Sequence, residues 1–310
     1  MPSAATDNDE AQSTLLQGPS KPVKGSLCSG NWKLAFKGVH AIAETPSRFP
    51  YADRFEVEGQ AVSSELVIEA LSMQLMDERA GRFERVAQHR CYSIMPVVEG
   101  LVDRGNVGAI CRSADAMGFG TMHCIDTSSG RVKSSRANRT SKGAEKWLDV
   151  QEHKHGTAAC IAYLKACGFN VLVTQLTPTS VPIHDIDFTQ PTAFILGNEV
   201  NGASEEAIAL ADQAVTVPMS PSFVESFNVS VAAALIMSEA RRQRMAKSGR
   251  SGDLTPEEAR ILTAAMLLKQ RGSRAVQWHP LWRDAFLQAS ASATPLKTPE
   301  QQIRMPCNAV

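Results

Sequence analysis

The chain has 310 residues, of which 43% are hydrophobic, and its formal net charge is +0. This length allows one large or two small domains with an ordinary core. Zero net charge excludes a protein that is basic as a whole, although local basic patches stay open. No apolar run reaches the length that a bilayer requires, so we expect no membrane span.

Cysteine usage and the first residues bear on the compartment. The seven cysteines form no CxxC pair and are odd in number, which predicts free thiols in a reducing environment. The chain begins with acidic residues and without an apolar stretch, unlike a signal or transit peptide. We therefore expect a cytoplasmic protein, with an organellar address in the N-terminal segment as the open alternative.

The predicted elements begin after a long polar segment. Residues 1–60 mix Ser, Pro, Gly and Gln with few periodic apolar positions, which predicts a largely disordered extension with at most a short ordered stretch at 32–36. Residues 63–88 carry apolar side chains at helical spacing, which predicts one helix.

Strands and helices then alternate along the chain. The predicted strands are 92–98, 121–125, 170–176, 192–196 and 214–217. The predicted helices are 107–117, 157–166, 204–210 and 255–270. The strands are continuous apolar runs, which is typical of strands covered on both faces. The pattern predicts an α/β fold with a parallel sheet flanked by helices.

The segment 218–234 is the most informative part of the chain. A helix follows its polar loop and is apolar on every side for two turns, which predicts a buried helix. The start of this helix nevertheless carries Ser226, Asn228 and Ser230, whose side chains need hydrogen-bond partners. The pattern predicts a ligand site there; the alternative is that these side chains only satisfy backbone donors.

Two other loops carry candidate chemistry. Spacing favours Asn106 as a helix N-cap and Arg112 as a surface residue paired with Asp115. A predicted strand ends in Gly197, and Glu199 follows in a tight loop, at the strand end where open α/β sheets bind ligands. An ordinary strand-to-helix turn explains that second loop equally well.

Together, in this order and spacing, the three segments resemble the motifs of the SpoU branch of the SPOUT RNA methyltransferases. The resemblance spans about 78–274 and includes Asn106 with Arg112, Gly197-Asn198-Glu199 and Ser226 to Ser230. Phe227 stands where the family usually has Leu. The resemblance implies an α/β-knot fold with a C-terminal trefoil knot, a feature that periodicity does not reveal and that general folding rules treat as rare.

The resemblance also divides the chain. Composition predicts the disordered extension over 1–60, which lies outside the resemblance, and the chain continues with a helical segment over 61–90 and a methyltransferase domain over 91–248. A C-terminal helical extension over 249–290 and a loose tail over 291–310 follow.

The activity implied by the resemblance is methyl transfer from S-adenosylmethionine to a ribose 2'-hydroxyl of RNA. The segment 254–274 resembles the extension of members that act on tRNA, which favours a D-loop guanosine of tRNA. An rRNA substrate and a catalytically silent RNA-binding protein are the alternatives. The implied partners are tRNA and a second copy of the chain in a homodimer, without a membrane.

The resemblance assigns site residues as well. The implied catalytic residues are Arg112, Asn106, Glu199, Ser226 and Asn228. The implied cofactor-binding residues are Thr174, Gly197, Val217, Met219 and Phe227. Because a guanidinium is always protonated, Arg112 suits holding an RNA phosphate and polarising the hydroxyl better than acting as a base.

Two basic runs flank the predicted site. The residues expected to contact RNA phosphates are Arg131, Lys133, Arg136, Arg139, Lys142, Arg241, Arg242 and Arg244. His153 and His155 lack further ligands at metal spacing, so we expect surface residues and no metal. The absence of GxGxxG and Walker loops disfavours nicotinamide and nucleoside-triphosphate chemistry.

Overall fold

The computed structural model describes residues 40–42, 47–57, 60–72, 75–101, 103–125 and 140–270. The predictions for 32–36 and 291–310 lie outside these residues. So do four of the expected RNA contacts, Arg131, Lys133, Arg136 and Arg139. Across the described segments, no helix combines the length and apolar character that a membrane crossing needs.

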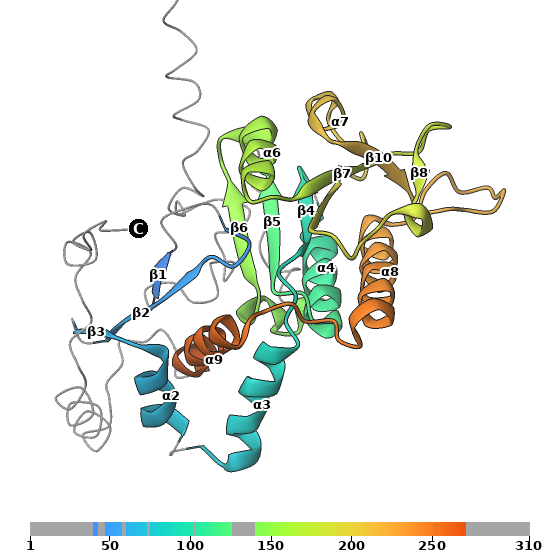
Figure 1. Ribbon diagram of the computed structural model, residues 1–310. Helices are drawn as coiled ribbons and strands as arrows, with labels where there is room; N and C mark the ends of the chain where they lie inside the picture. The colour runs from blue at the N-terminus through green and yellow to red at the C-terminus, as the bar shows by residue number, and fades with distance from the viewer. Residues whose placement is uncertain are drawn as a thin grey trace, which may run out of the picture.

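A seven-stranded sheet lies at the centre of the molecule (Figure 1). Its spatial order is β6 (Asp149–His153), β5 (Thr121–Ile125), β4 (Ile94–Glu99), β9 (Thr192–Leu196), β7 (Asn170–Thr174), β10 (Gln213–Thr216) and β8 (Val181–Pro182). All neighbouring strands run parallel. The predicted α/β class with a parallel sheet is confirmed.

Helices cover both faces of this sheet. They are α4 (Arg104–Met117) and α8 (Val229–Ser248) on one face, and α6 (Gly156–Ala166) and α7 (Glu205–Leu210) on the other. Side chains alternate along a strand, so Ile94 and Val98 of β4 pack with α4 and α8, whereas Met95 and Val97 pack with α6. Burial on both faces explains why the strands are continuously apolar. Two 3₁₀ turns, η1 (Ala144–Lys146) and η2 (Ile183–Asp185), complete this part.

A second core lies beside the sheet. Its elements are the antiparallel strands β1 (His40–Ile42), β2 (Tyr51–Val57) and β3 (Gln60–Val62), with helices α2 (Ser64–Ser72), α3 (Asp77–Gln88) and α9 (Pro256–Gln270). The single helix predicted over 63–88 is therefore two helices, each packed against α9. The prediction of a disordered segment to residue 60 is wrong for β2, because Tyr51 and Phe55 are buried in this core.

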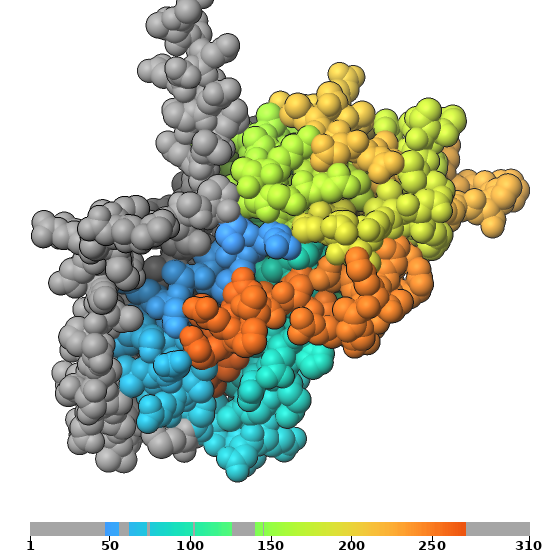
Figure 2. Space-filling view, viewed as in Figure 1, coloured from blue at the N-terminus to red at the C-terminus, as the bar shows by residue number. Residues whose placement is uncertain are grey.

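The segment between β10 and α8 projects from the body of the molecule, at the right of Figures 1 and 2. Phe223 and Val224 on it are exposed. The projecting segment leads into the start of α8, where the polar side chains of the candidate site lie.

Candidate active site

Two hydrogen bonds join the three candidate loops. The Asn106 Nδ2 group donates to Glu199 Oε1 at 2.9 Å, and these residues are 93 positions apart in the chain. The Asn228 Nδ2 group donates to Asn106 Oδ1 at 3.2 Å across 122 positions. One side chain from each loop therefore meets at a single place, as the resemblance implies.

Asn106 reaches the other loops because another residue caps its helix. The N-cap of α4 is Asp103, whose carboxylate accepts the Gly105 N–H at 2.8 Å. The prediction of Asn106 as the cap is thus wrong. Its amide lies in the first turn of the helix and contacts Glu199 and Asn228 instead.

Asn228 is itself the N-cap of α8. Its Oδ1 accepts the Ser230 N–H at 2.9 Å and the Ser230 hydroxyl at 2.6 Å. The donor group of the same amide is left for Asn106. The alternative that this side chain satisfies backbone donors is therefore confirmed for Asn228, and the ligand site stays a prediction.

The loop after β9 is a tight turn. A Cβ added to Gly197 would lie 2.0 Å from the Ala203 nitrogen, so the packing of the turn itself requires glycine. Asn198 holds the turn by donating to the Gly100 carbonyl at 2.6 Å and accepting the Val200 N–H at 2.8 Å. This arrangement presents the Glu199 carboxylate to Asn106.

A cavity of about 520 Å³ lies beside these loops, within the size range of small-molecule sites. Its lining includes every predicted cofactor residue, namely Thr174, Gly197, Val217, Met219 and Phe227. Glu199, Ser226 and Asn228 of the predicted catalytic set also line it. Asn106 contacts two of the lining residues from outside the cavity wall. The cavity and the polar side chains therefore form one site.

Arg112 stands apart from this site within one chain. It is exposed on α4 and is not a lining residue of the cavity. Six residues after Asn106 place it about 240° around the helix from that amide. The predicted pair of Arg112 with Asp115 is wrong, because Asp115 pairs with the buried Arg90.

The described basic residues differ in their exposure. Lys142, Arg241 and Arg242 are exposed, and Arg242 pairs with Glu239 at 2.7 Å. The Arg244 side chain is only 11% exposed and pairs with Asp253 at 3.0 Å. Its charge is engaged inside the chain, which corrects the expectation that it belongs to the RNA surface.

The prediction that the start of α8 is buried on all sides is also wrong. One side of α8 packs Ala233, Ile236 and Met237 against the core, but Val231 is 45% and Leu235 38% exposed. A single chain has no element to cover this second apolar side in the part of the structure described.

His153 is another correction. It is buried at the end of β6, and its Nε2 lies 2.8 Å from Nδ1 of His123 on β5. Burial lowers the pKa of His153 to about 4, so the ring is neutral at physiological pH. Sequence reasoning missed His123, because the two rings meet through strand pairing; His155 is exposed as predicted.

Comparisons with known proteins identify relatives of the chain. Residues 93–238 match the SpoU rRNA Methylase family. The tRNA (guanosine(18)-2'-O)-methyltransferase of Thermus thermophilus is 38% identical over 169 residues, which cover 54% of this chain and 84% of the relative. The enzyme of that name from Escherichia coli is 41% identical over 140 residues, covering 45% and 58% respectively.

A solved structure is similar as well. The crystal structure of the A. aeolicus TrmH/SpoU tRNA modifying enzyme has a TM-score of 0.56 and 27% identity, covering 63% of this chain and 97% of that one. The residues that match the family include the three loops that meet at the cavity. The chain belongs to the SpoU methylase family.

Proposed function

We propose that the chain is an S-adenosylmethionine-dependent tRNA (guanosine-2'-O)-methyltransferase that modifies the ribose of guanosine 18. The observation that carries this proposal is the hydrogen-bonded set of Asn106, Glu199 and Asn228 at the edge of the cavity. The names of relatives 38% and 41% identical to the chain support guanosine 18 of tRNA as the substrate.

The cavity fits the cofactor. S-Adenosylmethionine supplies a methyl group activated by a sulfonium. The apolar side chains of Val217, Met219 and Phe227 suit the faces of an adenine ring, while Thr174 and the backbone at Gly197 add polar groups. A volume of about 520 Å³ accommodates a molecule of this size.

The polar side chains position the RNA ribose. The Glu199 carboxylate and the amides of Asn106 and Asn228 form a connected set whose members hold one another in place. Holding the 2'-hydroxyl at a fixed orientation lowers the entropic part of the barrier. Arg112 binds an RNA phosphate and polarises the hydroxyl, because a guanidinium is a donor and not a base. The hydroxyl proton leaves to phosphate or water.

The active unit in this proposal is a homodimer. Val231 and Leu235 form an exposed apolar side of α8 that a second copy would cover. Arg112 lies outside the cavity of its own chain. In the proposed dimer it reaches the cavity of the second copy.

Complementation tests this arrangement. Arg112→Ala and Asn228→Ala are co-expressed with different tags, and the mixed dimer is isolated through both tags. One of its two sites then has both residues intact, so about half of the parental activity returns although each variant alone is inactive. An inactive mixed dimer would show that Arg112 serves its own chain.

Three further assignments complete the proposal. The exposed Lys142, Arg241 and Arg242 contact RNA phosphates. The trefoil knot lies around the second and third loops, which is supported by the return of α8 from the β10 side of the sheet to α4 in the middle. The cytoplasmic location stays a prediction that a fluorescent fusion would test.

Methyl transfer to matched RNAs tests the substrate. The parent protein, given labelled cofactor, is expected to methylate a tRNA transcript but not the same transcript with adenosine at position 18. Methylation of rRNA fragments without tRNA would favour the rRNA alternative. Calorimetric binding of cofactor without transfer to any RNA would favour the silent RNA-binding alternative.

A further inference from the structure

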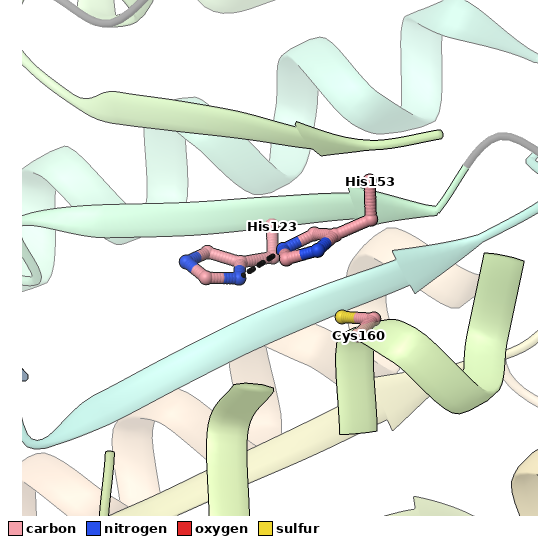
Figure 3. Close-up of side chains that lie close together, drawn as sticks. All are labelled: His123, His153 and Cys160. Carbon is pink, nitrogen blue, oxygen red and sulfur yellow. Dashed lines mark hydrogen bonds between the residues drawn. The ribbon is translucent and has the colours of Figure 1, made fainter. Parts of the chain in front are cut away.

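A second group of side chains, of types that can coordinate a metal ion, lies outside the cavity of the candidate active site (Figure 3). It consists of His123 from β5, His153 from β6 and Cys160 from α6, and one ligand atom of each lies within 4.8 Å of the other two. All three residues are buried, at 0%, 6% and 0% exposure. None of them lines the cavity of the candidate active site.

The fold explains why these side chains converge. β5 and β6 are parallel neighbours, with Ile125 opposite His153, so His123 lies two residues back on the same face. Helix α6 follows β6 directly and packs on that face, where Cys160 lies in a cluster of apolar side chains. Three rigid elements therefore fix the relative positions of the donors.

One hydrogen bond joins the two imidazoles of this group. The two rings share one contact at 2.8 Å between His123 Nδ1 and His153 Nε2. The other nitrogen of His123, Nε2, is buried and has no hydrogen-bond partner among the described residues. An ion held between the facing nitrogens would take Nδ1 of His123, and Nε2 would then be the nitrogen that carries the ring proton.

The donor set selects the class of ion. Two imidazoles and a thiol suit thiophilic ions such as Zn²⁺ and Cu⁺, whereas Mg²⁺ and Ca²⁺ prefer oxygen donors. Ligand atoms on one zinc ion stand roughly 3.3 to 3.7 Å apart, as its bond lengths require. Separations between 2.8 and 4.8 Å thus need only small side-chain rotations to close on one ion.

We propose that His123, His153 and Cys160 bind one thiophilic metal ion, Zn²⁺ or Cu⁺, which joins β5, β6 and α6 in a structural site. On binding, the proton between the two rings moves to the other nitrogen of its own ring. The Cys160 thiol releases its proton to solvent as the metal–sulfur bond forms. One proton therefore leaves the protein for each ion bound.

Metal titration of the full-length protein tests the site. Protein stripped with a chelator is expected to bind one Zn²⁺ or Cu⁺ per chain and to release one proton per ion in weakly buffered solution. Co²⁺ as a probe of the zinc geometry is expected to give thiolate-to-cobalt charge-transfer absorption. Competition between Zn²⁺ and Cu⁺ at matched chelator concentration identifies the preferred ion.

Variants assign the binding to these residues. Cys160→Ser and His153→Gln are expected to weaken binding at least about 100-fold. Cys167→Ser, at the end of the same helix, is the control and should change the affinity less than threefold. Metal binding that Cys160→Ser leaves intact would overturn the proposal. Should the variants fail to fold, a parent protein without the cobalt–thiolate absorption would overturn it too.

Discussion

The side chain of Asn228 serves two neighbours at once. Its oxygen caps α8 through Ser230, while its amide nitrogen donates to Asn106. In the proposed function, stability and catalysis therefore depend on different atoms of one residue. The two contributions can be separated by changing one atom.

Asn228→Asp makes that separation. Aspartate is as good an N-cap as asparagine, so the melting temperature is expected to stay within about 2 °C of the parent. The donor to Asn106 is lost, so kcat for methyl transfer is expected to fall at least about 10-fold. Asn228→Ala, which lacks both groups, is the comparison and should also lose about 1 kcal/mol of stability. Parental activity in Asn228→Asp would contradict the assigned role.

A second residue of interest is the buried Asp149, at the start of β6. It accepts hydrogen bonds from the hydroxyls of Tyr51 and Tyr92, which link β2 and the start of β4 to the edge of the sheet. Burial nevertheless raises the pKa of Asp149 from 3.8 to about 6. The folded protein thus holds a proton that the unfolded chain has lost between these two pH values.

The stability of the protein should reflect this proton. Because the folded state binds more protons between about pH 4 and 6, stability is expected to fall by up to about 3 kcal/mol as the pH rises through that window. Urea unfolding between about pH 4 and 6 gives the free energy of unfolding of the parent and of Asp149→Asn. The contributions of other titrating groups cancel in the difference between the two proteins. A difference that is constant, or that changes in the opposite direction, would contradict the assigned pKa.

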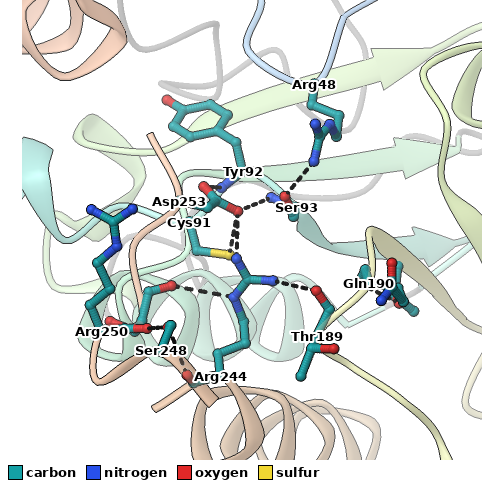
Figure 4. Close-up of polar contacts among 12 residues, drawn as sticks. Arg48, Cys91, Tyr92, Ser93, Thr189, Gln190, Arg244, Ser248, Arg250 and Asp253 are labelled. Carbon is teal, nitrogen blue, oxygen red and sulfur yellow. Dashed lines mark hydrogen bonds and ion pairs between the residues drawn. The ribbon is translucent and has the colours of Figure 1, made fainter. Parts of the chain in front are cut away.

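At the scale of an element, helix α8 carries arginines with separate tasks. The guanidinium of Arg244 pairs with Asp253, as Figure 4 shows. Asp253 also accepts the N–H groups of Tyr92 and Ser93. These contacts hold the segment between α8 and α9 beside the start of β4. Arg241 is exposed to solvent, and Arg242 is exposed while pairing with Glu239.

Substitutions should separate these tasks. Arg241→Ala is expected to weaken tRNA binding and to reduce the slope of log affinity against log salt by about 1, with stability unchanged. Arg244→Ala is expected to destabilise the fold by about 2 kcal/mol because it leaves the half-buried Asp253 carboxylate without its cation. Filter binding and urea unfolding measure the two effects. A salt slope that Arg241→Ala leaves untouched would remove this residue from the RNA surface.

At the scale of the whole molecule, two cores support one site. The parallel sheet with α4, α6, α7 and α8 carries the cavity, and the second core of α2, α3, α9 and the small sheet lies beside it. The exposed apolar side of α8 is a feature that a single chain leaves uncovered in the described structure. The proposed homodimer accounts for it.

Oligomeric state tests this account. Leu235→Glu places a charge in the proposed interface and is expected to give monomers by light scattering, whereas the parent forms dimers. Met76→Glu is the control. It changes another apolar residue, which is 76% exposed and lies far from α8 in the sequence, and this variant should remain dimeric. A dimeric Leu235→Glu would place the interface elsewhere.

The sequence predicts those strands whose own residues are apolar enough to indicate that the strand is buried. The bounds of β5 and β9 match the prediction, and β4, β7 and β10 end within two residues of it. β6 was missed because Asp149 and His153 are polar and are buried only through partners from distant segments. β2 was missed because it follows a long polar segment, and its Tyr51 and Phe55 become buried only in the assembled second core.

The site was predictable to a different degree. Each loop was ambiguous by spacing alone, and the resemblance to a family was needed to join residues 93 and 122 positions apart. The preference of helix N-caps for asparagine predicted Asn106 as the cap of α4, but the helix begins earlier and the carboxylate of Asp103 caps it. Arg112 lies outside the cavity because its side chain leaves α4 in a different direction from that of Asn106. The spacing of residues along the chain does not show where the other two loops lie around this helix.

The most direct test of the central claim is the position of the transferred methyl group. A tRNA transcript is treated with the parent protein and cofactor, digested, and analysed by mass spectrometry. We expect a single methyl group on the ribose of guanosine 18, with an alkali-resistant linkage after it, and a large loss of this product with Asn228→Asp. A methyl group on a base, or equal product from the parent and Asn228→Asp, would contradict the account.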